Sequence, residues 1–182
     1  MALMVVIKYG DPMLRKKCAK VTDFSNLPIL VDDMFDTMYE EEGIGLAANQ
    51  VGVDLNLMVI DVSHTVETDD THTFVNGEIT DSWGDSVFEE GCLSIPEVRL
   101  EVKRPEFIKF KYQTIEGNEK EEEFTGLLGR AIQHEIDHLN GILIIDRVSP
   151  IVRMQVKKQL KEIEKVSKQK KTPKDRKESF VL

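Results

Sequence analysis

His134 and His138 stand four residues apart, and Glu135 lies between them. On a helix this spacing places both imidazoles on one face, one turn apart, where they can bind the same divalent cation. Such a cation acidifies a water, and an adjacent glutamate can accept the proton that this water loses. The spacing therefore predicts metal-assisted hydrolysis with Glu135 as the general base.

The helix that carries these residues is predicted to span 126–140, because Gly141 is a typical C-terminal stop. Two histidines and a glutamate can also occur on a helix that merely packs. However, this helix is apolar on more than one side and should be buried, where histidines need partners. Its apolar positions are Leu127, Leu128, Ala131, Ile132, Ile136 and Leu139.

A hydrolytic site of this kind needs a third protein ligand. The metzincin pattern is excluded, because Ile144 occupies the place of its third histidine. Glu162 or Glu164 would suit a thermolysin-like peptidase, although both lie among lysines, which are typical of a solvated helix face. Cys92 is the other candidate, since glycine and proline nearby favour a turn that can present a thiolate.

Three segments decide between these candidates by resemblance. They are 43–50 (GIGLAANQ), 89–96 (EEGCLSIP) and 133–139 (QHEIDHL). In this order they resemble the three signature motifs of the peptide deformylase family. The resemblance implies that Cys92, His134 and His138 bind the metal and that Glu135 is the acid and base. It also implies that Gln50 and the backbone amide of Leu93 form an oxyanion hole.

By this resemblance the substrate is the N-formylmethionyl end of a nascent polypeptide, and the products are formate and a free amino terminus. The oxyanion donors would stabilise the negative oxygen of the tetrahedral intermediate. Other possibilities remain at this point. The chain could be a metallopeptidase, or a deformylase-like protein that acts on another N-acylated substrate or only binds peptides.

Residues that contact the peptide are expected from the family resemblance, by their position in the family pattern. Gly43 and Gly45 permit a loop that approaches a peptide closely, although Gly43 could equally be a helix stop. An apolar pocket for the methionine side chain is expected beside the metal, with the stem of an arginine packed at its border and the charged head in water. The residues expected there are Ile44, Phe88, Leu127, Arg130 and Ala131.

The Cys/His₂ ligand set suits iron, zinc, nickel and cobalt. The family resemblance implies Fe(II) as the native metal. Cys18 and Cys92 are the only cysteines, and a disulfide between them would consume a ligand, so a reducing, cytoplasmic compartment is expected. A charged partner for the ligands is also expected, from Glu90, Arg104 and Asp137.

The chain has 182 residues, 41% of them hydrophobic, which suits one globular domain. We expect an α+β fold in which largely antiparallel, mixed sheets enclose the central metal-binding helix, followed by a C-terminal helix. Helices are predicted at 29–41, 126–140 and 149–168. Strands are predicted at 1–7, 56–61, 98–103, 107–112 and 121–124. His64 and His72 are expected on a surface loop.

Charge is unevenly divided along the chain. The net charge is −9, yet residues 150–182 carry 11 Lys and Arg against 4 Asp and Glu. We expect the catalytic domain to span 1–168, with the C-terminal helix docked through Val152, Val156, Leu160 and Ile163, and a basic, flexible tail at 169–182. This basic end could contact the ribosome through phosphates. No segment approaches the roughly 20 apolar residues of a membrane span, and 1–7 does not resemble a signal peptide.

Overall fold

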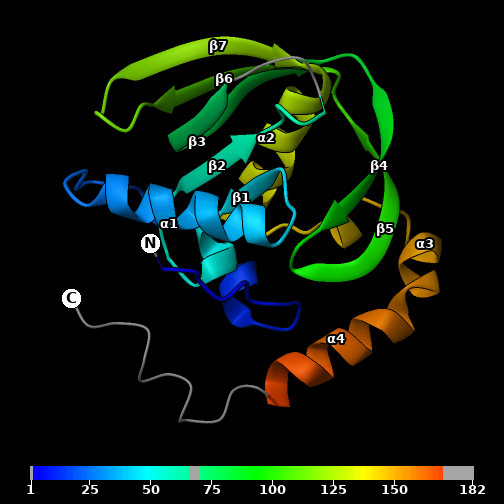
Figure 1. The fold of residues 1–182 in the computed structure, drawn as a ribbon. Coiled ribbons are helices and arrows are strands. Elements are labelled where there is room, and N and C mark those ends of the chain that lie inside the picture. Colours follow the sequence, from blue (N-terminus) through cyan, green and yellow to red (C-terminus); the bar gives the residue numbers. More distant parts are fainter. Residues whose placement is uncertain (1, 66–69, 170–182) are drawn as a thin grey trace.

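The computed structural model describes residues 2–65 and 70–169. Helix α2 runs through the middle of the molecule, between a five-stranded sheet and a two-stranded hairpin (Figure 1). The sheet has the order β1-β2-β3-β6-β7, and every pair within these residues is antiparallel. Its strands are β1 (Gly45–Ala47), β2 (Leu57–Asp61), β3 (Thr71–Trp83), β6 (Phe107–Gln113) and β7 (Glu119–Thr125), and the hairpin is β4 (Ser86–Cys92) with β5 (Ile95–Arg104). The predicted fold class is confirmed.

Helix α2 (Gly126–Leu139) is buried along most of its length, as its sequence predicted. Ile132 and Ile136 pack against Phe74 and Phe110 of the main sheet in one apolar cluster. The helix ends at the expected glycine, because Gly141 has a φ of 75°, which favours a residue without Cβ. The core of the molecule thus fixes the helix that carries both histidines.

Helix α1 (Leu27–Glu40) ends in a way that the sequence did not predict. The amide of Gly43 donates to the carbonyl of Met38 (2.9 Å) and that of Glu42 to Tyr39 (3.0 Å), which is a Schellman motif. The left-handed residue of this motif is Glu42, with a φ of 56°, and not Gly43. Gly43 has a packing role instead, since a Cβ there would lie 2.7 Å from the side chain of Leu93.

The predicted C-terminal helix is broken into α3 (Pro150–Gln155) and α4 (Lys157–Gln169), with a turn at Val156. Its predicted docking face is confirmed. Leu160 is buried in a cluster with β5, and Val152, Val156 and Ile163 pack partly buried against the same cluster. Residues 170–182, which hold nearly all of the predicted tail, lie outside the described residues.

Two further expectations were wrong, and three strands were missed. The described part of 1–7 belongs to no strand. His72 is not in a loop, because it lies in β3 and stacks on Phe74 (5.6 Å between ring centroids). Strands β1, β3 and β4 were not predicted at all. No helix of the described ranges is long and apolar enough to cross a membrane.

Candidate active site

Three ligand atoms converge where α2 meets the end of β4. His134 and His138 place their Nε2 atoms 3.3 Å apart, and the Sγ of Cys92 lies 3.2 Å from the Nε2 of His138. One ligand atom from each residue lies within 4.8 Å of the other two. The predicted ligand set is therefore brought together, although its cysteine is 42 residues from the nearer histidine in sequence.

The separation of the two imidazole nitrogens fits a tetrahedral metal ion. With metal–nitrogen bonds of about 2.0–2.1 Å, two imidazole nitrogens at a tetrahedral angle lie about 3.3–3.4 Å apart. The observed separation of the Nε2 atoms is 3.3 Å. Burial and nearby positive charge, from His134 first, hold the pKa of His138 well below its usual range, so this imidazole is in the neutral form that binds metals.

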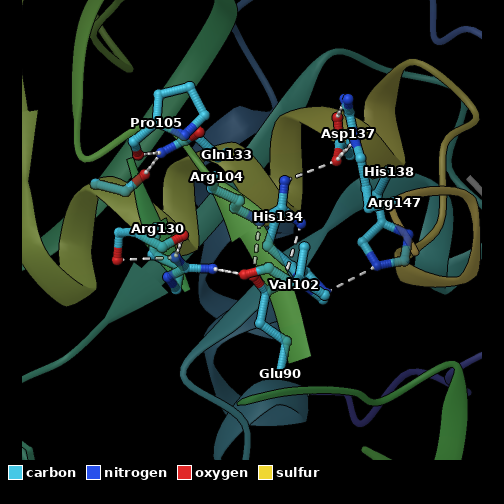
Figure 2. A network of polar contacts seen from close by, with 12 residues as sticks. Glu90, Val102, Arg104, Pro105, Arg130, Gln133, His134, Asp137, His138 and Arg147 are labelled. Carbon is cyan, nitrogen blue, oxygen red and sulfur yellow. Dashed lines mark hydrogen bonds and ion pairs between the residues drawn. The ribbon is translucent and has the colours of Figure 1, made fainter. Parts of the chain in front are cut away.

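Glu90 orients the first histidine (Figure 2). Its Oε1 accepts from the Nδ1 of His134 (2.9 Å), which leaves the Nε2 of that ring for a metal. Arg104 donates twice to the same carboxylate (2.7 and 2.9 Å) and Arg130 once (2.6 Å). Burial disfavours the charged carboxylate, but these partners, His134 and Arg104 foremost, outweigh burial and hold the pKa of Glu90 well below its usual range.

Arg104 also joins Glu90 to Asp137, so the three charged residues expected near the ligands form one bridge. Its Nη1 donates to Asp137 (2.9 Å), and Arg147 donates to both oxygens of the same carboxylate (2.9 and 2.6 Å). Asp137 lies one residue before His138 on α2. The network thus fixes α2 against β4 and β5 beside both histidines.

Glu135 has a different environment. It is 4% exposed, and its Oε2 has no hydrogen-bond partner among the described residues. Burial first, together with the negative charge of Glu90, raises its pKa to about 7, against the opposing effect of His134 and Arg104. The carboxylate lies directly against the backbone of Gly45, where a Cβ would be 2.5 Å from Oε1. Such a group can take up and release a proton near neutral pH.

Gln50 is held in one orientation beside Cys92. Its Oε1 accepts from the amide of Ala47 (2.9 Å), and its Nε2 donates to Ser94 Oγ (3.2 Å) and lies 3.9 Å from Cys92 Sγ. All of these contacts form within a 3-10 turn and the hairpin turn after Cys92. The side-chain amide is therefore preorganised next to the metal ligands.

The residues predicted to contact a peptide divide into two groups. Ile44 and Leu127 pack partly buried against the cluster that contains Ala131, so these three come together. Phe88 is 54% exposed on β4, and its ring lies 5.7 Å from the guanidinium carbon of Arg130. The expectation of a wet arginine head was wrong, because Arg130 is buried and donates to Glu90, Ser86 and Val102.

The glutamates of the peptidase alternative lie elsewhere. Glu164 is on α4, where it pairs with Lys168 (2.7 Å) and lies over Gly10, and Glu162 is exposed on the same helix. A thermolysin-like ligand set is therefore not formed.

Sequence reasoning missed two residues that support the site. Ser94 was inside a recognised segment, where its small hydroxyl beside a ligand cysteine was the available signal. Arg147 carried no signal, because its pairing with Asp137 depends on how the turn after α2 folds.

Comparisons with known proteins agree with this geometry. The family model described as polypeptide deformylase matches residues 3–154. A peptide deformylase of Thermodesulfovibrio yellowstonii is 46% identical over 88% of this chain and 98% of its own length. One of Thermoanaerobacter pseudethanolicus is 47% identical over 90% of this chain and 100% of its own.

Solved structures are similar as well. A peptide deformylase from Legionella pneumophila superposes with a TM-score of 0.83 at 40% identity, over 94% of this chain and 100% of that one. A peptide deformylase from Thermus thermophilus superposes with a TM-score of 0.85 at 37% identity, over 91% of this chain and 99% of that one. The chain belongs to the peptide deformylase family.

Proposed function

We propose that this chain removes the formyl group from N-formylmethionine at the start of new polypeptides and releases formate. The observation that carries the proposal is the convergence of Cys92, His134 and His138 near Glu135, whose buried Oε2 has no hydrogen-bond partner in the part of the chain that the structure describes. These parts fit hydrolysis of an amide, and the family membership selects the formyl amide.

The chemistry is divided between the metal and the side chains. A divalent cation held by the three ligands would polarise the formyl carbonyl and acidify a water. Glu135 accepts the proton of the attacking water at a carboxylate oxygen, while the water oxygen bonds to the formyl carbon. When the carbon–nitrogen bond breaks, Glu135 returns the proton to the leaving nitrogen, which gives formate and a free amine.

The oxyanion that forms on the formyl oxygen needs hydrogen-bond donors. We assign one to Gln50, because its Nε2 is held by Ser94 Oγ (3.2 Å) and donates toward Cys92 Sγ (3.9 Å), so the side-chain amide lies next to the proposed metal ligand. We assign the second to the amide of Leu93, in the turn that follows Cys92. Each such donor is typically worth roughly 3 kcal/mol in the transition state.

Peptide-contacting roles are proposed for the residues around this centre. Gly43 and Gly45 would line the peptide, and the methionine side chain would lie against the apolar cluster of Ile44, Leu127 and Ala131. Phe88 would cover it from β4, since its ring is exposed. Arg130 would not contact the methionine side chain itself; its guanidinium would support the ring of Phe88, from which it lies 5.7 Å away.

Formate release tests the proposal. Protein loaded anaerobically with iron or nickel is given formyl-Met-Ala-Ser, acetyl-Met-Ala-Ser and an unblocked peptide, and formate, acetate and internal cleavage are measured. We expect formate only. Acetate release would indicate a different N-acyl substrate, and internal cleavage a peptidase.

We propose Fe(II) as the native metal, with zinc, nickel or cobalt as substitutes. Thiolate and imidazole donors accept all four, so the family resemblance supports iron specifically. Metal analysis of protein purified without oxygen tests this, and zinc as the dominant metal under those conditions would contradict it.

We also propose that residues 1–168 form one catalytic domain with a basic tail at 169–182, working in the cytoplasm close to ribosomes. The support is the exposed basic face of α4, formed by Lys157, Lys158, Lys161, Lys165 and Lys168. Lysines bind phosphates in a salt-dependent way. Cosedimentation with ribosomes should weaken with salt and be lost on deletion of 168–182, and an unchanged bound fraction would oppose the idea.

A further inference from the structure

The segment from Ile7 to Tyr9 bonds to the backbone carbonyls of Gln50, Leu93 and Ser94, in the two turns that carry the proposed oxyanion hole. The amide of Ile7 donates to the carbonyl of Gln50 (2.8 Å), and the amide of Tyr9 to that of Ser94 (2.8 Å). Between them, the ammonium of Lys8 donates to the carbonyl of Leu93 (2.8 Å). Three successive residues thus join the turn of Gln50 to the hairpin turn after Cys92.

This hairpin turn needs such support. Cys92 pairs with Ile95, so Leu93 and Ser94 form a two-residue loop. Two-residue hairpin loops favour type I′ or II′ turns, in which at least the first central residue has a positive φ. Leu93 and Ser94 are not among the residues with positive φ. The backbone of this loop is therefore not the one that a hairpin favours by itself, and contacts from outside must hold it.

Lys8 contacts this loop through its side chain, whereas Ile7 and Tyr9 bond through their backbone amides. Its ammonium bonds to the central peptide of the loop, which joins Leu93 to Ser94, and it also forms an ion pair with Glu41 (3.6 Å). Behind the segment, α4 packs closely, since Glu164 lies against Gly10 and Ser167 Oγ is 3.5 Å from the carbonyl of Lys8. The lysine is thus backed by a helix and aimed at the loop.

We propose that Lys8 is a positioning residue for deformylation. By fixing the Leu93–Ser94 peptide, it keeps the amide of Leu93 and the hydroxyl that holds Gln50 in register with the metal ligands. The inference rests on the proposed function, because it assumes that Gln50 and Leu93 stabilise the oxyanion. Lys8 would lower the energy of the transition state, and it would change neither metal binding nor the binding of the peptide in the ground state.

Steady-state kinetics of nickel-loaded variants tests this inference on formyl-Met-Ala-Ser. Lys8→Met keeps the alkyl stem but loses the bond to Leu93, and Lys8→Arg keeps a donor. Glu41→Gln is the matched control, since it removes the ion pair of Lys8 and leaves the bond to the loop. Metal content and Tm are measured for each protein, and Lys8→Ala replaces Lys8→Met if the latter does not fold.

We expect kcat of Lys8→Met to fall about tenfold, as for a small misplacement of a catalytic group. KM should stay within about twofold, because ground-state binding is unchanged. Metal content and Tm should match wild type, Lys8→Arg should recover most of kcat, and Glu41→Gln should keep all of it.

An unchanged kcat in Lys8→Met would overturn the inference alone, provided that wild type releases formate. A loss that accompanies lower metal content or a lower Tm, or that Glu41→Gln reproduces, would also overturn it, because the lysine would then have a merely structural role. Absence of formate release by well-metallated wild type would instead overturn the proposed function and this inference with it.

Discussion

Two buried glutamates near the candidate metal centre have opposite environments. Burial disfavours the charged form of Glu90, but His134 and Arg104 outweigh burial and hold its pKa well below the usual range, and Arg130 also donates to this carboxylate. Glu135 has an oxygen without a partner in the described residues, and burial raises its pKa to about 7. We propose that these environments give the two carboxylates different roles: Glu90 stays charged and orients His134, and Glu135 exchanges a proton.

Removing the charge of Glu90 should therefore weaken the metal site. In Glu90→Gln the Nδ1 of His134 loses its carboxylate partner, and Arg104 and Arg130 lose theirs. Metal affinity should fall about 10–100-fold, as is typical when such a partner of a ligand is removed. Competition with a chelator measures this.

Glu89→Gln is the matched control, because Glu89 is the exposed neighbour on the same strand. It should bind metal like wild type. Equal affinities for Glu90→Gln and Glu89→Gln would refute the assigned role of Glu90.

Asp61 gives a pH-dependent prediction away from the metal ligands. Burial raises the pKa of its carboxyl, but hydrogen bonds from Ser63 and from the Tyr39 hydroxyl outweigh burial, so the pKa is lowered. A lowered pKa contributes stability above the unfolded value, about 3.9, and this stability is lost as pH falls through the folded value. Asp61→Asn should thus be less stable than wild type at pH 7, with the difference narrowing below about pH 4.

Urea unfolding at several pH values measures that difference. Tyr39→Phe, which keeps the bond from the Ser63 amide, should show a smaller difference with the same direction of pH dependence. A gap between wild type and Asp61→Asn that widens as pH falls would contradict the assignment.

At the scale of elements, the end of α1 offers a stability prediction. Glu42 adopts a left-handed conformation that a residue with Cβ adopts at a cost. Glu42→Gly should therefore stabilise the protein by about 0.5–1 kcal/mol, and denaturant unfolding measures it. Gly43→Ala, one residue later, should destabilise, because its Cβ would crowd Leu93. Stabilisation by both changes would contradict the Schellman motif.

The sequence predicted those elements whose burial pattern is periodic. Helix α2 was predicted to within one residue, because its apolar positions and Gly141 mark it clearly. Strands β3 and β4 were missed, since they are partly exposed and rich in polar residues such as Asp81 and Glu89. The turn at Val156 was missed for another reason: its apolar side chain continues the helical pattern although the backbone breaks there.

At the scale of the whole molecule, the site depends on contacts between distant segments. The ligands were predicted from motif resemblance, but the bridge from Glu90 through Arg104 to Asp137 was not, because its pairing exists only after β4, β5 and α2 meet. The same holds for Ser94 and Lys8, whose roles follow from their neighbours and not from their residue types.

A site assembled in this way should couple metal binding to global stability. A metal that binds only the folded chain stabilises it, by about 4 kcal/mol at a thousandfold excess over Kd. Chelation should therefore lower Tm, and readdition of metal should restore it. Cys92→Ser should make Tm much less sensitive to metal, whereas Cys18→Ser, at a buried cysteine that is not one of the three proposed ligands, should keep the response. A Tm that is independent of metal in wild type would contradict this coupling.

The central claim is that the Cys92, His134 and His138 centre hydrolyses a formyl amide with Glu135 as its acid and base. The most direct test is formate release from formyl-Met-Ala-Ser by wild type and Glu135→Gln, each with one metal per chain confirmed beforehand. We predict release by wild type and a loss of at least about a hundredfold in the variant, in the range of general acid–base catalysis. Comparable release by the two proteins would contradict the account.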